Sequence, residues 1–219
     1  MDSDIFHRMV QEGNSQLDIS SMVRLTPQTD VVLPVSKIWS NKPMAFWSIK
    51  AIILSISRDA FNIGMALDRL ESPDNNHARH MVIDRLGKIY LAAGLTTALR
   101  HVNSHRRGAG DLNNDNTISI ELLNCGMVPE KRLQHKRMIM RDTSDIFHYK
   151  LPRHNVVSAY DRHYYEIFAQ EQLDTLKKLL RQLRKLNPVL ETVSANYWPS
   201  ISYYKLTPVF PHARFGVQI

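Results

Sequence analysis

The run IKAIILSIS, residues 49–57, restricts the possible folds of this chain more than any other stretch. Its aliphatic residues follow one another without the three- to four-residue spacing of an amphipathic helix, and the run has the length of one strand. Continuous aliphatic strands are typical of the centre of a sheet that is covered on both faces. We therefore predict a central strand here, in a domain that contains both a sheet and helices.

Three further strands are expected. The sequence HMVIDRLGKIYLAA predicts a hairpin, with strands at 80–84 and 88–92 around a turn that contains Gly87. The alternating run TISIELLN predicts a strand at 117–123, after a loop rich in glycine and asparagine. A short helix is expected over DAFNIGMALDRLES, between the first strand and the hairpin, with Asp59 as its N-cap.

The longest helix is predicted over AQEQLDTLKKLLRQLRKLN, residues 169–187. Its leucines recur at three- and four-residue spacing, which places them on one apolar stripe. Lysine and arginine fill much of the remaining surface toward its C-terminal end, and we interpret this basic face as solvated. The order of strands and helices indicates an α/β (α+β) domain with a mixed central sheet flanked by helices.

The composition is that of a basic globular protein. Lysine and arginine number 28 against 21 aspartates and glutamates, and the formal net charge of +7 favours anionic ligands. The single cysteine, Cys125, excludes an internal disulfide and a thiolate-rich metal site, and we interpret it as a small buried hydrophobe. The sequence contains no recognisable secretory signal and no apolar run near the roughly 20 residues that span a membrane. We expect a cytoplasmic protein, or a virion-associated one if a phage encodes it.

Several strings, taken in order, resemble the N-acetylmuramoyl-L-alanine amidases, a family that includes phage amidase-type lysozymes and the peptidoglycan recognition proteins. HMVIDRLGKIYLAA resembles the family's histidine-containing hairpin, and ALRHVNSHRRGAGDLNNDNTISIELLNCG resembles its substrate loop and following strand. YYEIFAQEQLDTLKKLLRQLRKLNP is similar to its helix, and the resemblance covers roughly residues 48–216. It implies an amidase-like domain at 46–219, with an extension at 1–45 and an insertion at about 127–160.

Active members of that family hold a zinc ion with two histidines and an aspartate. The resemblance places the first histidine at the end of the central strand, where this sequence has Ser55. In the string YWPSISYYKLTPVFP, it places the second at Tyr197, eight residues before Lys205, and the aspartate at Thr207. Neutral hydroxyl groups are poor zinc ligands, and without zinc there is no obvious nucleophile for an amide. The resemblance thus implies a chain that keeps the fold, lacks the zinc chemistry and needs no cofactor.

Glu121 lies in the predicted strand 117–123, and a carboxylate in a buried strand is either paired or functional. The resemblance matches it to a carboxylate near the floor of the active site, and matches Lys205 to a lysine that stabilises an oxyanion. We predict that Glu121 is a remnant of catalysis, held by Lys205 or by backbone donors, with ligand contact as the alternative. The residues expected to line the family cleft are Ser55, His80, His101, His105, Asn114, Glu121, Tyr197, Lys205 and Thr207.

Other kinds of site receive less support. His101 and His105 are four residues apart, but they lie in a loop rich in glycine and asparagine, where helical spacing has no meaning for a metal site. Ser55 lacks the glycine-flanked turn of a nucleophile elbow, and we expect no catalysis by Ser55 or Cys125. No nucleic-acid motif accompanies the basic residues of two loops, so nucleic acid is not an expected partner. These basic residues are Arg106, Arg107, Lys131, Arg132, Lys136, Arg137 and Arg141.

The function expected from these observations is that of a catalytically inactive amidase-fold protein, a pseudo-amidase of phage or prophage origin. Its former active-site cleft would bind peptidoglycan fragments or another anionic ligand. One alternative is an active, divergent N-acetylmuramoyl-L-alanine amidase with relocated zinc ligands. Another is an inhibitor or virion component that binds a protein partner through residues 127–160. Zinc content and turnover of muropeptides separate the first two.

Overall fold

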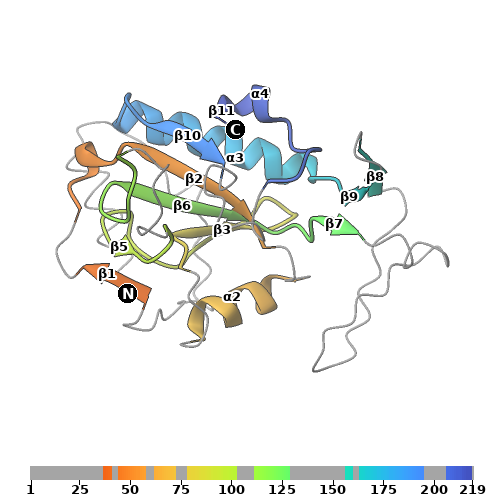
Figure 1. Cartoon of the computed structure of the whole chain (residues 1–219), viewed down its shortest axis with the longest axis horizontal. Coiled ribbons are helices and arrows are strands. Elements are labelled where there is room, and N and C mark those ends of the chain that lie inside the picture. Colours follow the sequence, from red (N-terminus) through yellow and green to blue (C-terminus); the bar gives the residue numbers. More distant parts are fainter. Residues whose placement is uncertain are drawn as a thin grey trace.

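The structure is a computed structural model, and it describes residues 37–40, 44–57, 62–72, 78–102, 111–128, 156–159, 163–194 and 206–218. A six-stranded sheet with the order β11-β10-β2-β6-β3-β4 forms its centre (Figure 1). Its strands are β2 (Ala51–Ile56), β3 (Met81–Ile83), β4 (Ile89–Leu91), β6 (Thr117–Leu122), β10 (Glu191–Ser194) and β11 (Val217–Gln218). The mixed sheet and the central place of the aliphatic run are therefore as predicted.

The direction of the strands brings the carboxyl-terminal ends of several strands to one side of the sheet, which we call the carboxyl-terminal edge of the sheet. β2 pairs in parallel with β10 and with β6, and β6 pairs in parallel with β3. β3 and β4 form the predicted antiparallel hairpin, in which Gly87 adopts a φ of 76°. A β-carbon on Gly87 would lie 2.7 Å from the carbonyl oxygen of Glu171, so glycine also permits the close approach of the turn to the long helix.

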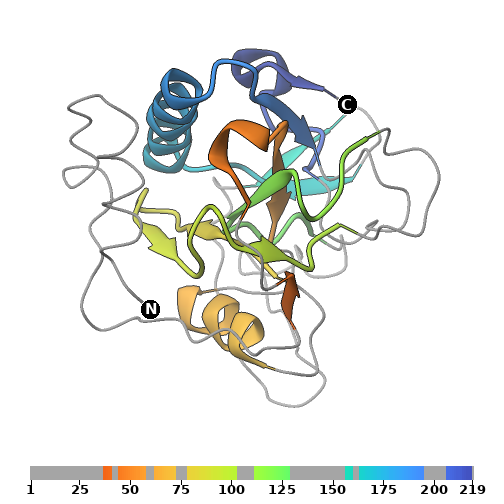
Figure 2. The ribbon, with the colours of Figure 1, turned by 90° about the vertical axis from the view of Figure 1, so that its left-hand side faces the viewer.

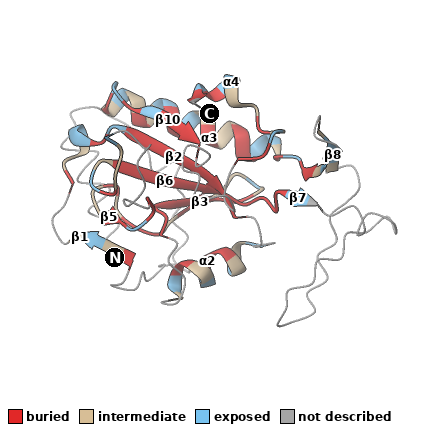
Figure 3. Ribbon diagram, in the orientation of Figure 1, coloured by how far each residue is buried: buried red, intermediate tan, exposed pale blue. Residues whose placement is uncertain are grey.

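The two faces of the sheet differ in chemistry because side chains alternate along each strand. One face is aliphatic and packs against the leucines of α3 (Gln170–Leu186). The other carries Ser55 of β2 and Glu121 of β6, together with Val82, which packs against α2 (Ile63–Glu71). Figures 1 and 2 show α3 and α2 on opposite sides of the sheet, and Figure 3 shows that the strands between them are buried.

Both predicted helices are present. α3 confirms the helix predicted at 169–187, and five leucines of its stripe are buried, whereas Arg181 and Lys185 are exposed. α2 has a different N-cap from the one predicted. The Asn62 side chain accepts a hydrogen bond of 2.9 Å from the Met65 amide, and Asp59 lies outside the described residues.

Two smaller sheets flank the central one. β1 (Ile38–Ser40) pairs antiparallel with β5 (Ala98–Leu99), so part of the segment predicted as an irregular extension is a strand; residues 1–36 lie outside the described part. β7 (Met127–Val128), β8 (Val156–Ser158) and β9 (Tyr164–Glu166) form a sheet with the order β7-β9-β8. β7 and β8 thus lie near the two ends of the predicted insertion, of which residues 129–155 are not described.

The remaining elements are short. A 3-10 turn, η2 (Phe46–Ser48), precedes β2, and α4 (His212–Phe215) precedes β11. Within the described ranges, no helix has the length and apolar character needed to cross a membrane.

Candidate functional site at the strand ends

Ser55 and Glu121 stand opposite each other near the carboxyl-terminal ends of β2 and β6. They are direct neighbours across a parallel strand pair, and both are buried, at 1% and 6% exposure. In open sheets of parallel strands, ligand sites form beyond this end of the strands. The strand register therefore brings together two of the residues that the sequence assigned to the family cleft.

Arg79, from the segment before β3, is the described partner of both residues. Its Nε lies 3.2 Å from Glu121 Oε2 and donates to Ser55 Oγ at 3.1 Å, while Nη1 donates to the Ala78 carbonyl at 2.7 Å. The prediction named Lys205 or backbone donors as the partner of Glu121. Glu121 is held by Arg79, a partner that the prediction did not name, while Lys205 lies outside the described residues and its contact with Glu121 stays a prediction.

The surroundings of Glu121 carry more positive than negative charge. Burial raises the pKa of the Glu121 carboxyl above its ordinary value, and Arg79, Arg69 and Lys37 oppose that rise. Burial, with a contribution from Arg79, lowers the pKa of Lys37 to about 8. The Lys37 ammonium donates to the carbonyls of Arg69, at 2.6 Å, and Leu70 at the C-terminal end of α2. This lysine therefore joins the β1 segment to α2 beside the ion pair.

The two described histidines of the predicted cleft are buried and hydrogen-bonded within the protein. His80 Nε2 donates to the Thr97 carbonyl at 2.9 Å, and Nδ1 accepts from the Ser119 amide at 3.0 Å. His101 Nδ1 donates to the Leu99 carbonyl at 2.9 Å, and Nε2 lies 2.8 Å from Thr117 Oγ1. Burial lowers the pKa of His80 to about 4 and that of His101 well below its ordinary value, so both rings are neutral near pH 7.

The Asn114 side chain is also buried and hydrogen-bonded within the protein. Its Oδ1 accepts from the amides of His101, at 3.1 Å, and Val102, at 2.8 Å, and its Nδ2 donates to the Val102 carbonyl at 3.1 Å. The side chain is 1% exposed and closes the loop after β5 onto the turn before β6. In this arrangement, neither Asn114 nor the two histidines presents a free polar atom to a ligand.

Thr207 is the described cleft residue that differs from this pattern. It is 5% exposed, and its Oγ1 is buried without a hydrogen-bond partner. A β-carbon placed on Gly126, which follows β6, would lie 3.7 Å from Thr207 Cγ2 and 2.8 Å from Ile56 Cδ1. Thr207 thus lies near the carboxyl-terminal end of β2. His105 and Tyr197, the other predicted cleft residues, fall outside the described ranges.

The side chains described at this edge do not fit a zinc ion. Within the described residues, no group of three or more His, Cys, Asp or Glu side chains is arranged to hold a metal. Ser55 and Thr207 present neutral hydroxyls, and Ser55 Oγ already accepts a hydrogen bond from a permanently charged guanidinium. No reaction step through a metal follows from this arrangement.

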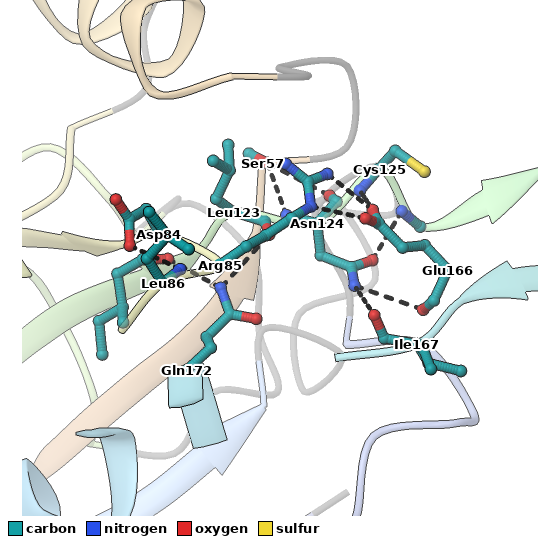
Figure 4. A network of polar contacts seen from close by, with 12 residues as sticks. Ser57, Asp84, Arg85, Leu86, Leu123, Asn124, Cys125, Glu166, Ile167 and Gln172 are labelled. Atoms are coloured by element: carbon teal, nitrogen blue, oxygen red, sulfur yellow. Dashed lines mark hydrogen bonds and ion pairs between the residues drawn. The ribbon is translucent and has the colours of Figure 1, made fainter. Parts of the chain in front are cut away.

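A second polar network connects the three-stranded sheet β7-β9-β8 to the carboxyl-terminal edge of the central sheet (Figure 4). The sequence analysis did not predict this network. Arg85 of the hairpin turn holds buried Glu166 with two parallel hydrogen bonds, Nε to Oε1 at 2.6 Å and Nη2 to Oε2 at 2.9 Å. Glu166 Oε2 also accepts from the Cys125 amide at 2.6 Å. Asn124 Nδ2 donates to the carbonyls of Glu166, at 3.3 Å, and Ile167, at 3.4 Å. The network fixes β9 against the chain that leaves β6.

Cys125 is buried, as predicted. It is 1% exposed, and burial, with a contribution from Glu166, raises the pKa of its thiol. Arg79, Arg85 and Glu166 had a weak signal in the sequence. Arg79 and Arg85 adjoin the predicted hairpin and Glu166 precedes the predicted helix at 169–187, but only the fold shows which charges meet.

Comparison with solved structures finds several similar chains. The chain is similar to the N-acetylmuramoyl-L-alanine amidase LysC from Clostridium intestinale URNW, at 13% identity and a TM-score of 0.46, over 81% of this chain and 92% of LysC. It is similar to a selenomethionine derivative of AmpD, at 13% identity and a TM-score of 0.47, over 84% of this chain and 97% of that one.

The third is the E. coli N-acetylmuramyl-L-alanine amidase AmiD, in complex with an anhydro-N-acetylmuramic acid peptide substrate. It shows 14% identity and a TM-score of 0.40, over 76% of this chain and 51% of AmiD. No protein-family model and no curated protein matches the sequence. The neighbours are of the family that the sequence strings resemble. At these identities and TM-scores they assign no activity to this chain, so its function has to be inferred from its own residues.

Proposed function

We propose that this chain is a catalytically inactive amidase-fold protein that acts by binding or as a structural component. The observation that carries the proposal is the Arg79 guanidinium, held between Ser55 and Glu121 at the carboxyl-terminal edge of the sheet. Ser55 stands where the family resemblance expects a zinc-binding histidine. A permanent cation therefore lies next to the position that a metal would need.

Electrostatics supports this proposal. A zinc ion on Ser55 Oγ would lie about 2 Å from that atom, and Arg79 Nε lies 3.1 Å from it, so the two cations would be at most about 5 Å apart. At an effective dielectric constant of about 20, a double and a single positive charge at that separation repel by roughly 6–7 kcal/mol. Glu121, already paired with Arg79, is the carboxylate described beside them, and hydroxyl ligands offer no negative charge to offset the repulsion.

Ligand binding at this edge then depends on the groups that the ion pair leaves unused. Of the described cleft residues, Thr207 has a side-chain oxygen without a partner, whereas Ser55, Glu121, His80, His101 and Asn114 are engaged inside the protein. We propose that Thr207, with His105, Tyr197 and Lys205, contacts a peptidoglycan fragment or another anionic ligand. A phage or prophage origin, and location in the cytoplasm or a virion, belong to the same proposal.

The test combines metal content with turnover. Protein purified without a metal-binding tag is analysed for zinc per chain and assayed for cleavage of the muramoyl–alanine amide of a soluble muropeptide. The proposal expects clearly sub-stoichiometric zinc and no cleavage, with or without added zinc. Close to one zinc per chain together with cleavage would overturn it in favour of a divergent amidase with relocated ligands.

A further inference from the structure

The outward side of α3 carries a concentration of positive charge that the proposed function does not use. Between residues 175 and 190 the sequence has five basic residues and no acidic one. We call these five the α3 basic stripe: Lys177, Lys178, Arg181, Arg184 and Lys185. The buried leucines of α3 fix the rotation of the helix on the sheet and leave Lys178, Arg181 and Lys185 exposed. α3 covers the face of the sheet opposite to the one that carries Ser55 and Glu121 (Figure 2), so the stripe is separate from the strand-end site.

Arg181 lies at the centre of this stripe. On a helix, residues three and four positions apart are surface neighbours, with β-carbons about 5–6 Å from each other. All four such neighbours of Arg181 are basic: Lys177, Lys178, Arg184 and Lys185. Like charges at this spacing destabilise a helix. α3 therefore maintains an arrangement of charge that is unfavourable for its own folding.

The acidic residues of the chain do not offset this charge. Asp174 lies three residues before Lys177 and four before Lys178, which is the spacing of a helical ion pair. Its Oδ1 instead accepts from Gln170 Nε2 at 2.8 Å and from Arg214 Nη2 at 3.2 Å. In the part of the chain that the structure describes, no ion pair involves the α3 basic stripe. The whole chain carries +7, of which the stripe supplies five, so the remaining residues are not negative on balance.

The structural roles of basic residues in a helix account for only part of the stripe. Arg184 and Lys185 lie in the last turn of α3, where the helix dipole favours positive charge. Arg184 also donates to Thr192 Oγ1 at 2.6 Å and so holds β10. Lys177, Lys178 and Arg181 lie before the last turn, beyond the range of the dipole. An anionic ligand would supply the compensating charge that the chain itself does not provide to these three residues.

We propose that the α3 basic stripe binds the phosphate backbone of double-stranded nucleic acid. The stripe extends over eight residues of helix, about 12 Å along the axis. Over that length one strand of duplex DNA carries three or four phosphates, at about 3.4 Å each. Lysine and arginine that neutralise phosphates release condensed counterions, and this effect alone drives binding without regard to base sequence. Such binding needs no base-reading motif, and the sequence has none.

Other anionic partners fit this surface less well. Single-stranded nucleic acid binds where bases can stack on aromatic side chains, and α3 contains no aromatic residue. A helix that lies on a membrane places an apolar face in the bilayer, whereas the apolar face of α3 packs on the sheet. The exposed residues of α3 are all polar: Gln170, Glu171, Lys178, Arg181 and Lys185. Val189, in the turn after α3, is 67% exposed, and anionic vesicles therefore form a second arm of the test.

The test measures binding of the full chain to a fluorescein-labelled DNA duplex of about 20 base pairs, by fluorescence anisotropy at several salt concentrations. Wild type is expected to bind duplexes of different sequence equally well. Its affinity should fall with rising salt, with a logarithmic slope of about −0.9 for each phosphate neutralised. The triple variant Lys178→Gln, Arg181→Gln, Lys185→Gln should make this slope less negative by about 2.7 and weaken binding about tenfold or more at about 50 mM salt.

A second triple variant controls for net charge. Lys50→Gln, Lys88→Gln, Arg100→Gln removes the same formal charge from residues outside α3 and is expected to leave the slope unchanged. Folding is controlled by urea unfolding. Because the stripe variant removes like charges that repel one another, its urea midpoint should be no lower than that of wild type, and its loss of binding then reflects the lost contacts.

Three results would overturn the proposal. One is the absence of duplex binding at about 50 mM salt. Another is an equal loss of affinity in the two triple variants, which would assign the binding to net charge and not to the stripe. The third is tighter binding to vesicles of phosphatidylcholine and phosphatidylserine than to the duplex, lost in the stripe variant, which would identify a lipid surface as the partner. Zinc content and muropeptide cleavage do not enter this test, so its failure leaves the proposed function standing.

Discussion

Replacing Arg79 with alanine should destabilise the protein more than most core substitutions do. The change removes the partner of a carboxylate that is 6% exposed and leaves Ser55 Oγ without its donor. Breaking a buried ion pair by deleting one partner typically costs about 3–5 kcal/mol, because the remaining charge stays desolvated. Since domains of this size are stable by about 5–15 kcal/mol, the variant should still fold but with a much lower urea midpoint.

The loss should depend on pH in a defined direction. Burial already raises the pKa of Glu121, and replacing Arg79 removes the strongest influence that holds this pKa down. A carboxyl with a raised pKa in the folded state contributes stability at pH values below its unfolded pKa, and this contribution is lost as the pH rises through the folded value. The difference in unfolding free energy between wild type and Arg79→Ala should therefore be largest near pH 7 and shrink toward pH 4.

The double variant Arg79→Met, Glu121→Leu tests the same reasoning without an unpaired charge. Apolar replacement of a whole buried pair is often neutral or stabilising, so its unfolding free energy should lie within about 1 kcal/mol of wild type at pH 7. Urea unfolding followed by circular dichroism measures all three proteins. A loss below about 1 kcal/mol for Arg79→Ala, with no pH dependence, would refute the reasoning and point to another cation, such as Lys205, as the true partner.

Three further outcomes are expected. Because the pKa of Lys37 is lowered to about 8, the unfolded chain binds more protons above that pH. Wild type should thus gain stability over Lys37→Met between about pH 8 and pH 10 in thermal unfolding, and a constant difference would contradict this. The Cys125 thiol, buried and with a raised pKa, should not react with Ellman's reagent at pH 8 until urea unfolds the chain; rapid reaction of the folded protein would show that the β6 end opens. Thr207→Val should leave the urea midpoint unchanged or raise it, since the Thr207 hydroxyl has no partner, and a clear decrease would show that it binds a water or a ligand.

The elements that the sequence predicted well are those with a strong local pattern. The aliphatic run at 49–57 and the leucine stripe at 169–187 each satisfy one periodicity, and the hairpin has both its strands and the glycine that its positive φ needs. β1 was missed because a three-residue strand has too few residues to show alternation. The N-cap of α2 was misplaced because Asp59 and Asn62 are both good caps, and only the start of the hydrogen-bonded turns distinguishes them.

The sequence predicted the strands that carry Ser55 and Glu121, but not the contacts of these side chains. Strand order and register, which no local pattern encodes, decide that Ser55 faces Glu121 and that Arg79 reaches both. His80 and His101 were expected to face a cleft, and the structure instead buries them, with ring hydrogen bonds to the carbonyls of Thr97, just before β5, and Leu99, in β5. A histidine beside a strand looks the same in sequence whether it faces a ligand or the core.

Arg79 also affects what it would take to rebuild a metal site in this chain. A histidine at position 55 would meet the guanidinium that now donates to Ser55 Oγ, and positions 197 and 207 would still supply hydroxyls. Removing Arg79 first leaves Glu121 buried without its ion-pair partner, at a cost of about 3–5 kcal/mol. Each single change toward zinc binding is therefore unfavourable by itself: one adds a ligand beside a cation, and the other destabilises the fold before any metal can compensate. Under the proposal of a zinc-free protein, the Arg79 guanidinium supplies the positive charge next to Glu121 that keeps this buried carboxylate of β6 paired.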